Sequence, residues 1–191
     1  MNQKGILVVV SGFAGTGKGT VMKGLLAKYS EQYALSVSMT TRSPRPGERH
    51  GIEYFFSTKE EFEHKIAQDG LIEYACYCDN YYGTPKDYVE EQLNAGKDVL
   101  LEIEIQGALQ VKEKLPETVL VFIMPPSVSE LYGRLKGRGT ETDEVIRQRM
   151  LRASEESQGI EQYDYILVND DIDTCVESLH QMIQSEKQRA C

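Results

Sequence analysis

Short, mainly apolar runs alternate along the chain with segments in which apolar residues recur every three or four positions. The runs have the length of strands covered on both faces of a sheet; they are residues 5–10, 98–105, 119–124 and 165–168. The periodic segments predict helices; they are residues 19–29, residues 127–135 with their Ser-Val-Ser-Glu capping sequence, and residues 172–188. Strands that alternate with helices in this way indicate an α/β fold with a parallel sheet.

Two segments interrupt this alternation. Residues 36–94 are rich in tyrosine and turn residues, with short strand patterns and a capped helix that begins near Ser57 and Thr58, so we expect an insertion with its own small sheet. Residues 137–152 are polar, contain two glycines at the start and become helical, which is typical of a mobile lid. We therefore expect one domain, with a core of residues 1–35, 95–133 and 153–191, an insertion of residues 36–94 and a lid of residues 134–152.

The composition is that of an ordinary globular protein with a surplus of acidic groups. The 191 residues include 21 Lys and Arg against 30 Asp and Glu, a formal net charge of −9. Nucleic-acid polymers are bound through basic surfaces, so this charge argues against such a partner. The longest apolar run is strand-sized and no signal-peptide core precedes the first predicted strand, so we expect a cytoplasmic protein without a membrane segment.

Basic residues nevertheless gather in two places. Arg42, Arg45 and Arg49 fall within eight residues, and six more Lys and Arg residues occur within residues 134–152. In an acidic chain, such local concentrations point to anionic ligands. The cysteines match neither a zinc-site nor a redox spacing, and we expect free thiols at all four, Cys76, Cys78, Cys175 and Cys191.

The loop between the first predicted strand and helix has the G-x-x-x-x-G-K pattern of a phosphate-binding loop. Its backbone N–H groups converge on a phosphate, and Lys18 adds a point charge for the β- and γ-phosphates of ATP. The next residue is Gly19, where the general pattern has a Mg²⁺-ligating Ser or Thr, so we expect phosphates and water to hold that ion. The residues expected to bind ATP here are Gly12, Phe13, Ala14, Gly15, Thr16, Gly17, Lys18, Gly19 and Thr20.

Seven further motifs are similar to those of guanylate kinases, in that family's order along nearly the whole chain. The first, Ser-Val-Ser-Met-Thr-Thr-Arg-Ser-Pro-Arg-Pro-Gly-Glu, closely resembles the S-x-S-x-T-T-R-x-P-R-x-G-E stretch of the family; the seven are residues 36–48, 53–56, 72–74, 80–84, 102–107, 138–141 and 168–170. The resemblance implies a P-loop NTPase-type parallel sheet flanked by helices, with a small mixed GMP-binding insertion and a short helical lid. It implies transfer of the γ-phosphoryl group of ATP to GMP, in purine nucleotide metabolism and GMP recycling.

The same resemblance places the acceptor nucleotide in the insertion. Arg42 and Arg45 resemble the pair that holds the GMP phosphate, and guanidinium groups suit bidentate phosphate contacts. Glu73 resembles the glutamate that accepts hydrogen bonds from guanine N1–H and N2–H₂, which adenine does not offer. Glu48 would orient an arginine. The full set expected at GMP is Ser38, Arg42, Arg45, Glu48, Tyr54, Glu73, Tyr82, Thr84 and Glu102.

The lid carries the basic residues that the resemblance assigns to the donor. Arg138 and Arg149 resemble the arginines that close over the ATP phosphates and the transferring group, and Arg134 is a weaker companion. For Arg147 and Arg152 we expect only an exposed basic helix face, paired with acidic residues nearby in the sequence.

Three assignments complete the donor site. Asn169 resembles a residue beside the adenine, and Glu104, where the family usually has Asp, would reach Mg²⁺ and Lys18 through water. GMP carries a phosphate that is already a dianion at neutral pH, so transfer needs no general base, and the three dispersed histidines are expected on the surface. The cofactor expected is Mg²⁺ with ATP, and the catalytic residues expected are Lys18, Arg42, Arg138 and Arg149.

Two other functions stay open at this point. A non-catalytic guanylate-kinase-like module that binds phosphopeptides or partner proteins would keep the fold, but such modules have lost phosphate-loop elements that this chain retains in Gly17 and Lys18. An enzyme with another acceptor, a different nucleotide or a ribose phosphate, is disfavoured by the complete acceptor set. The partners expected are ATP and GMP, with dGMP a weaker acceptor, and the patterns do not distinguish a monomer from a homo-oligomer.

Overall fold

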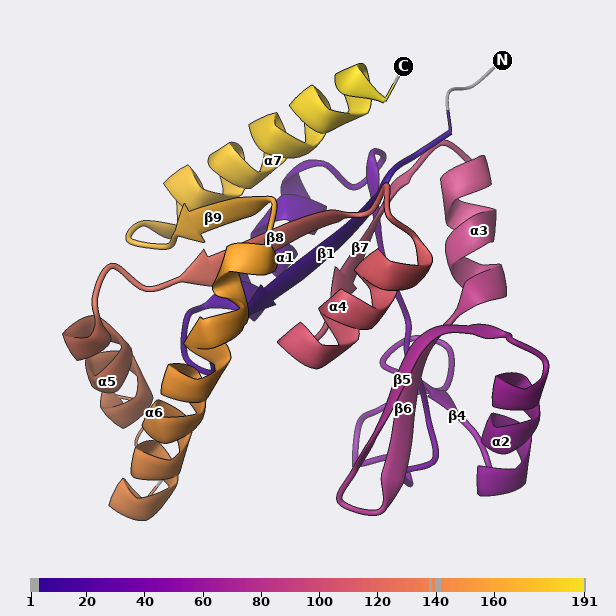
Figure 1. Cartoon of the computed structure of the whole chain (residues 1–191), viewed down its shortest axis with the longest axis horizontal. Helices are drawn as coiled ribbons and strands as arrows, with labels where there is room; N and C mark the ends of the chain where they lie inside the picture. The colour runs from indigo at the N-terminus through magenta and orange to yellow at the C-terminus, as the bar shows by residue number, and fades with distance from the viewer. Residues whose placement is uncertain (1–3, 138, 140–141, 191) are drawn as a thin grey trace.

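Five parallel strands form the central sheet, in the order β2-β7-β1-β8-β9 (Figure 1). The computed structural model describes residues 4–137, 139 and 142–190. The strands are β1 (Leu7–Gly12), β2 (Tyr33–Leu35), β7 (Asp98–Glu102), β8 (Val119–Met124) and β9 (Tyr165–Val168). This is the α/β parallel sheet predicted from the apolar runs, and the runs at 119–124 and 165–168 coincide with β8 and β9.

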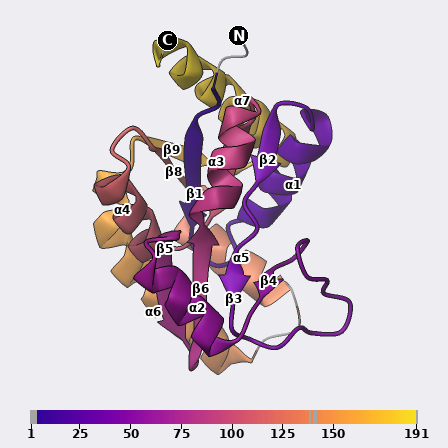
Figure 2. The ribbon, with the colours of Figure 1, turned by 90° about the vertical axis from the view of Figure 1, so that its right-hand side faces the viewer.

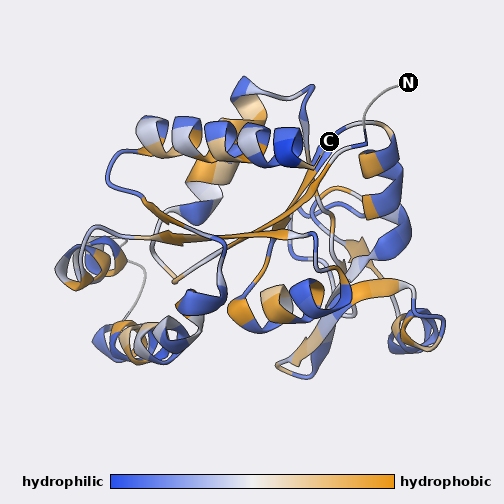
Figure 3. Cartoon of the chain, turned by 45° about the horizontal axis from the view of Figure 1, so that its top comes forward, coloured by the Kyte–Doolittle hydropathy of each residue, from blue (hydrophilic) through white to orange (hydrophobic). Residues whose placement is uncertain are grey.

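Helices lie on both faces of this sheet, as Figure 3 shows, and alternating residues of the strands pack against them. In β1, Val8 and Val10 belong to the apolar cluster of one face, and Leu7 and Val9 to that of the other. The first face is covered by α1 (Lys18–Lys28) and α7 (Ile172–Arg189). The second is covered by α3 (Lys86–Asn94), α4 (Ile105–Lys114), α5 (Val128–Gly137) and α6 (Asp143–Glu156), which the 3₁₀ turn η1 (Ser157–Gln162) follows. Burial on both faces explains why the strands are almost continuously apolar.

A second, mixed sheet has the order β4-β3-β6-β5 and lies beside the central one (Figure 2). Its small core contains Met39, Phe62 and Leu71. Its helix begins at a capping box, in which the Thr58 side chain accepts from Glu61 N and the Glu61 side chain accepts from Thr58 N. The elements are β3 (Met39–Thr40), β4 (Phe55–Phe56), α2 (Lys59–Ala67), β5 (Leu71–Tyr77) and β6 (Asn80–Pro85). All of them lie within residues 36–94.

The predicted strand at 98–105 is too long, and two helices were not predicted. The strand β7 ends at Glu102, and Ile105 already begins α4. The apolar residues that follow the end of β7 still pack against the core, where the chain enters the first turn of α4. Gly107 within α4 weakens the helical pattern of the sequence. The other missed helix, α3, follows Pro85 directly and buries Val89 and Leu93 four residues apart.

The C-terminal helix α7 is amphipathic and covers the sheet with one face. It buries Cys175, Val176, Leu179 and Ile183. The expectation that all histidines lie on the surface is wrong for His180, which stacks on Tyr29 at 3.8 Å between ring centres and shares a 2.7 Å hydrogen bond with the hydroxyl of Tyr33. Within the described residues, none of the helices combines the length and the apolar character needed to cross a membrane.

A buried ion pair ties α7 to the sheet. Asp98, at the start of β7, is fully buried, and its Oδ1 accepts from Ile6 N at 3.0 Å and lies 2.8 Å from Lys187 Nζ. We expect Asp98→Ala to lower the free energy of unfolding by about 2–4 kcal/mol, because a backbone donor and an ammonium group lose their buried acceptor. Urea denaturation measures the change.

The matched control is Glu63→Ala, since Glu63 pairs with Lys59 at 3.8 Å with both side chains more than half exposed. Exposed pairs contribute about 0–1 kcal/mol, so this variant is expected to unfold almost as the parent does. Equal losses in the two variants would contradict a structural role for the buried pair.

Candidate active site

The phosphate loop joins the end of β1 to the start of α1. Gly15 and Gly17 adopt φ of 93° and 82°, a left-handed conformation that favours glycine. Gly17 is the N-cap of α1 and offers no side-chain acceptor, so no described side chain caps the N–H groups of the first turn where an anion would approach this helix end. The loop thus has the backbone geometry expected of a phosphate site.

Two residues predicted at the ATP site contact this loop at the carbonyl of Thr16. Asn169, which follows β9, is buried and donates from Nδ2 to the carbonyl of Thr16 at 2.7 Å. Arg134 of α5 approaches the same carbonyl at 3.4 Å and is held by Glu130 at 3.0 Å. A Cβ added to Gly17 would lie 2.6 Å from Asn169 Nδ2, so Asn169 also requires glycine there. Asn169 was expected beside the adenine and Arg134 over the ATP phosphates; in the structure both contact the carbonyl of Thr16 in the phosphate loop.

The loop residues surround a cavity, here called the loop cavity. Phe13 turns its ring into the core, 4.9 Å from that of Phe122, so it can offer a ligand little but its backbone. Arg149 reaches the cavity from α6, whereas Arg138 lies outside the described residues. The loop cavity is lined by Phe13, Ala14, Gly15, Thr16, Gly17, Lys18, Gly19, Thr20, Lys23, Glu102 and Arg149.

Lys18 forms an ion pair with Glu102, the last residue of β7. Its Nζ lies 3.4 Å from Glu102 Oε1. Glu102 was expected at the guanine edge, and it lines both the loop cavity and a second cavity on the insertion side. The carboxylate that contacts Lys18 is thus shared between the two sides of the site.

The second cavity, here called the insertion cavity, brings together five of the nine residues predicted at GMP. They are Ser38, Tyr54, Glu73, Tyr82 and Glu102. Thr84 lies directly behind them, because its hydroxyl donates to Glu73 Oε1 at 2.6 Å. The remaining residues that line this cavity are Ala75, Tyr77, Gly83, Ile103, Glu104, Gln106 and Gly107.

Glu73 is a buried carboxylate, only 6% exposed. Burial raises the pKa of its carboxyl group, while the Thr84 hydroxyl and the positive charge of Lys114 oppose that rise. A carboxylate that is buried with few donors has accepting capacity left for a ligand. This is the chemistry that a group with adjacent N–H donors would satisfy.

The other three predicted residues form the loop next to this cavity. Glu48 accepts from Arg42 at 2.9 Å with one carboxylate oxygen and from Arg45 N at 2.7 Å with the other. This pairing raises the pKa of Arg42 and lowers that of Glu48. The Arg42 guanidinium lies 5.4 Å from the ring centre of Tyr54, whereas the Arg45 side chain is exposed. Glu48 therefore orients an arginine.

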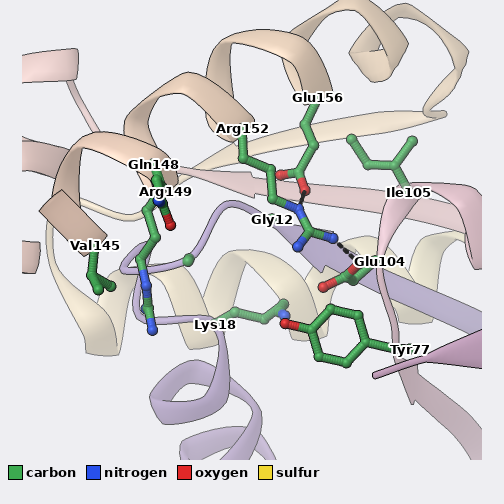
Figure 4. Close-up of a pocket in the computed structure, with 11 residues that line it drawn as sticks. Gly12, Lys18, Tyr77, Glu104, Ile105, Val145, Gln148, Arg149, Arg152 and Glu156 are labelled. Carbon is green, nitrogen blue, oxygen red and sulfur yellow. Dashed lines mark hydrogen bonds and ion pairs between the residues drawn. The ribbon is translucent and has the colours of Figure 1, made fainter. Parts of the chain in front are cut away.

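A third cavity, here called the central cavity, connects the two sides (Figure 4). Sequence reasoning missed Tyr77 of β5, whose hydroxyl points toward the Lys18 ammonium group in Figure 4. It also missed the role of Arg152, which pairs with Glu104 across the cavity and with Glu156 of its own helix. The central cavity is lined by Gly12, Ala14, Lys18, Tyr77, Glu104, Ile105, Val145, Gln148, Arg149, Arg152 and Glu156.

The expectation for the two remaining lid arginines is half correct. Arg147 pairs with Glu144 at 3.0 Å on the exposed face of α6, as predicted. Arg152 is also exposed and pairs locally with Glu156, but its second partner, Glu104, lies 48 residues away in the sequence. The available signal was its position three residues after Arg149, which puts both side chains on one side of the helix.

Comparison with known proteins identifies the family. The model of a family described as guanylate kinase matches residues 4–186. The chain belongs to the guanylate kinase family. The guanylate kinase of Latilactobacillus sakei subsp. sakei is 50% identical over 99% of this chain and 93% of that protein, and the guanylate kinase of Bacillus subtilis is 48% identical over 97% and 91%. The crystal structure of guanylate kinase from Anaplasma phagocytophilum matches with a TM-score of 0.74 at 33% identity, over 97% of this chain and 87% of that one.

The buried Glu73 gives a stability prediction. Its folded-state pKa is raised, so the folded chain binds this proton more tightly than the unfolded chain, and stability falls as the pH rises above the ordinary carboxyl pKa of about 4.3. Glu73→Gln removes this ionisation. We expect the variant to melt a few degrees above the parent at pH 7, with a difference that shrinks toward pH 4.

Thermal unfolding of both proteins across this pH range tests the expectation. Glu117→Gln, at an exposed position, is the control and should show no pH-dependent difference. A Glu73→Gln variant that melts below the parent at pH 7 would show that the ionised carboxylate stabilises the fold.

Proposed function

We propose that the chain catalyses transfer of the γ-phosphoryl group of ATP to GMP, giving ADP and GDP. The observation that carries this proposal is the continuity of the three cavities. Lys18 lines both the loop and the central cavity, and Tyr77 lines both the central and the insertion cavity. Two nucleotides that entered from opposite sides would bring their phosphates together at Lys18.

The donor phosphates belong in the loop cavity. Backbone N–H groups and Lys18 would bind the β- and γ-phosphates, and Arg149 would approach from α6. Asn169 and Arg134 hold the Thr16 carbonyl, which fixes the loop that these phosphates would contact. Arg138, assigned to the lid by its motif, would join Arg149.

Magnesium fits this arrangement as a partner of the nucleotide. The described residues hold no cluster of three or more His, Cys, Asp or Glu side chains that would bind a metal by themselves. Mg²⁺ keeps several waters and takes few protein ligands when phosphates bind it, so the exposed carboxylate of Glu104 in the central cavity suits a contact through water. Bound in this way, the ion would neutralise charge on the phosphates.

The acceptor belongs in the insertion cavity. Arg42, with Tyr54 and Tyr82 beside it, would bind the GMP phosphate, and Arg45 would swing in from the neighbouring loop. Glu73, with Ser38 and Thr84 nearby, would read the guanine edge. Adenine carries an acceptor at N1 and would leave the buried carboxylate unpaired, which is the strongest form of rejection.

The chemistry then requires little from a protein base. The GMP phosphate is already a dianion near neutral pH, because its second pKa is about 6. Catalysis is positioning of the two phosphates in line, together with stabilisation of the charge on the transferring group by Lys18, Arg42, Arg138 and Arg149. Closure of α6 and the insertion around the nucleotides would exclude water and limit wasteful hydrolysis.

The acceptor assay separates this function from the alternatives. We measure ADP formation from ATP and Mg²⁺ with GMP, dGMP, AMP, UMP or ribose bisphosphate as acceptor. We expect a strong preference for GMP, with dGMP weaker. Turnover with another acceptor alone would replace the substrate assignment, and no turnover with any of them would favour a binding module.

Lys18→Ala tests the phosphate loop. We expect turnover to fall by about 10²–10³-fold, because the variant loses the positive charge that stabilises the transferring phosphoryl group. The melting temperature should change little, since the lost ion pair with Glu102 is partly exposed. Lys28→Ala removes an ion pair with Glu177 at the other end of α1 and should keep full turnover. A large stability loss in Lys18→Ala would indicate a structural role instead.

Glu73→Gln tests the reading of guanine. The amide offers a donor where guanine also presents donors, so we expect weaker GMP binding by about tenfold or more and unchanged ATP binding. Calorimetric titration with each nucleotide measures both affinities. Equal losses for GMP and ATP would contradict the assignment.

A further inference from the structure

Arg152 links two parts of the chain across the central cavity. From α6, its NH2 group donates to Glu104 Oε2 at 2.5 Å, and its Nε donates to Glu156 Oε1 at 3.0 Å (Figure 4). Glu156 lies one turn further along the same helix, whereas Glu104 lies 48 residues away, at the start of α4. Arg152 is thus fixed within its own helix and holds a carboxylate that belongs to another element.

Glu104 has a fixed backbone and a side chain with few other contacts. It is the N-cap of α4, with its carbonyl accepting from Ala108 N at 3.0 Å, but its carboxylate makes no capping hydrogen bond to the helix. The side chain is 69% exposed. A glutamate has three side-chain torsions, so its carboxylate samples many positions unless a partner restricts it. The described contact that does so is the one to Arg152.

The negative charges around Arg152 favour its interaction with both carboxylates. The negative charges of Glu104 and Glu156 raise the pKa of Arg152, so its guanidinium stays charged. Its planar fork places one donor on each carboxylate at the same time. An ion pair with both partners this exposed adds little to folding stability. We therefore expect this ion pair to affect the position of the Glu104 carboxylate more than the stability of the fold.

We propose that Arg152 is a positioning residue, which holds Glu104 Oε2 so that Oε1 stays in the central cavity to accept a hydrogen bond from water bound to Mg²⁺. This rests on the proposed function, in which Glu104 is the carboxylate near the metal of MgATP. Outer partners that fix a metal-facing carboxylate strengthen metal binding without touching the ion. The role requires a side chain that contacts Glu104 across the cavity, whereas the neighbouring lid arginine Arg147 pairs with Glu144 of its own helix.

The test is Arg152→Gln, measured by calorimetric titration with the β,γ-imido analogue of ATP, with and without Mg²⁺. We expect the variant to bind the analogue about tenfold more weakly in the presence of Mg²⁺, at the lower end for outer partners of metal sites. Binding of the metal-free analogue should not change. The Mg²⁺ concentration at half-maximal GMP phosphorylation should rise by a similar factor.

Three further variants separate positioning from a general effect on α6. Arg147→Gln removes an exposed arginine of the same helix that pairs only locally, and should leave both affinities unchanged. Glu156→Gln should weaken Mg²⁺-dependent binding in the same direction but less, since Arg152 keeps its other partner. In a Glu104→Gln background, Arg152→Gln should have no additional effect, because no carboxylate remains to be held.

Each other outcome overturns the inference. Equal loss with and without Mg²⁺ would make Arg152 a phosphate-binding residue, and tighter binding with Mg²⁺ would make it a competitor of the ion. Unchanged Mg²⁺ dependence in Arg152→Gln or in Glu104→Gln would remove the role altogether. Turnover of ATP and GMP by the unaltered enzyme decides the proposed function separately, so its failure is distinguishable from failure at Arg152.

Discussion

The parallel pairing of β1 between β7 and β8 is the constraint on which the site depends. Val10 is in register with Glu102, and Gly12 with Ile123. Parallel strands end at the same edge of a sheet, so the loop after β1 and the carboxylate at the end of β7 meet there. The Lys18–Glu102 ion pair at 3.4 Å is a direct result. The insertion and α6 add residues to this edge from either side.

Charge compensation prepares this edge for anions. Two cations of the site face a carboxylate: Lys18 faces Glu102, and Arg42 faces Glu48. These pairs hold flexible side chains near the cavities before a ligand arrives, which lowers the entropic cost of binding. Partly exposed pairs are also weak, so phosphate oxygens can replace the carboxylates without a large penalty. The surplus of acidic residues is therefore compatible with two anionic substrates.

The sequence predicted the features that depend on residues close together in the chain better than those that depend on contacts between distant elements. Burial on both faces produced the apolar runs of β8 and β9, and the phosphate loop was recognisable because its glycines and Lys18 are adjacent. The capped start of α2 was equally local. The buried position of Asn169 and the partner of Arg152 depend on contacts between elements that are distant in the sequence. No spacing rule reaches such contacts, and the acceptor residues were found through resemblance for the same reason.

The misplaced end of β7 shows how a local structural detail affects the chemistry. Side chains two residues apart on a strand point to the same face, so a strand through residue 105 would place Glu102 and Glu104 side by side. Two adjacent carboxylates would repel each other and compete for the same cations. Because the strand stops at Glu102 and Glu104 caps α4, one carboxylate faces Lys18 and the other faces Arg152. The strand-to-helix transition therefore gives two neighbouring acids separate partners on the two sides of one site.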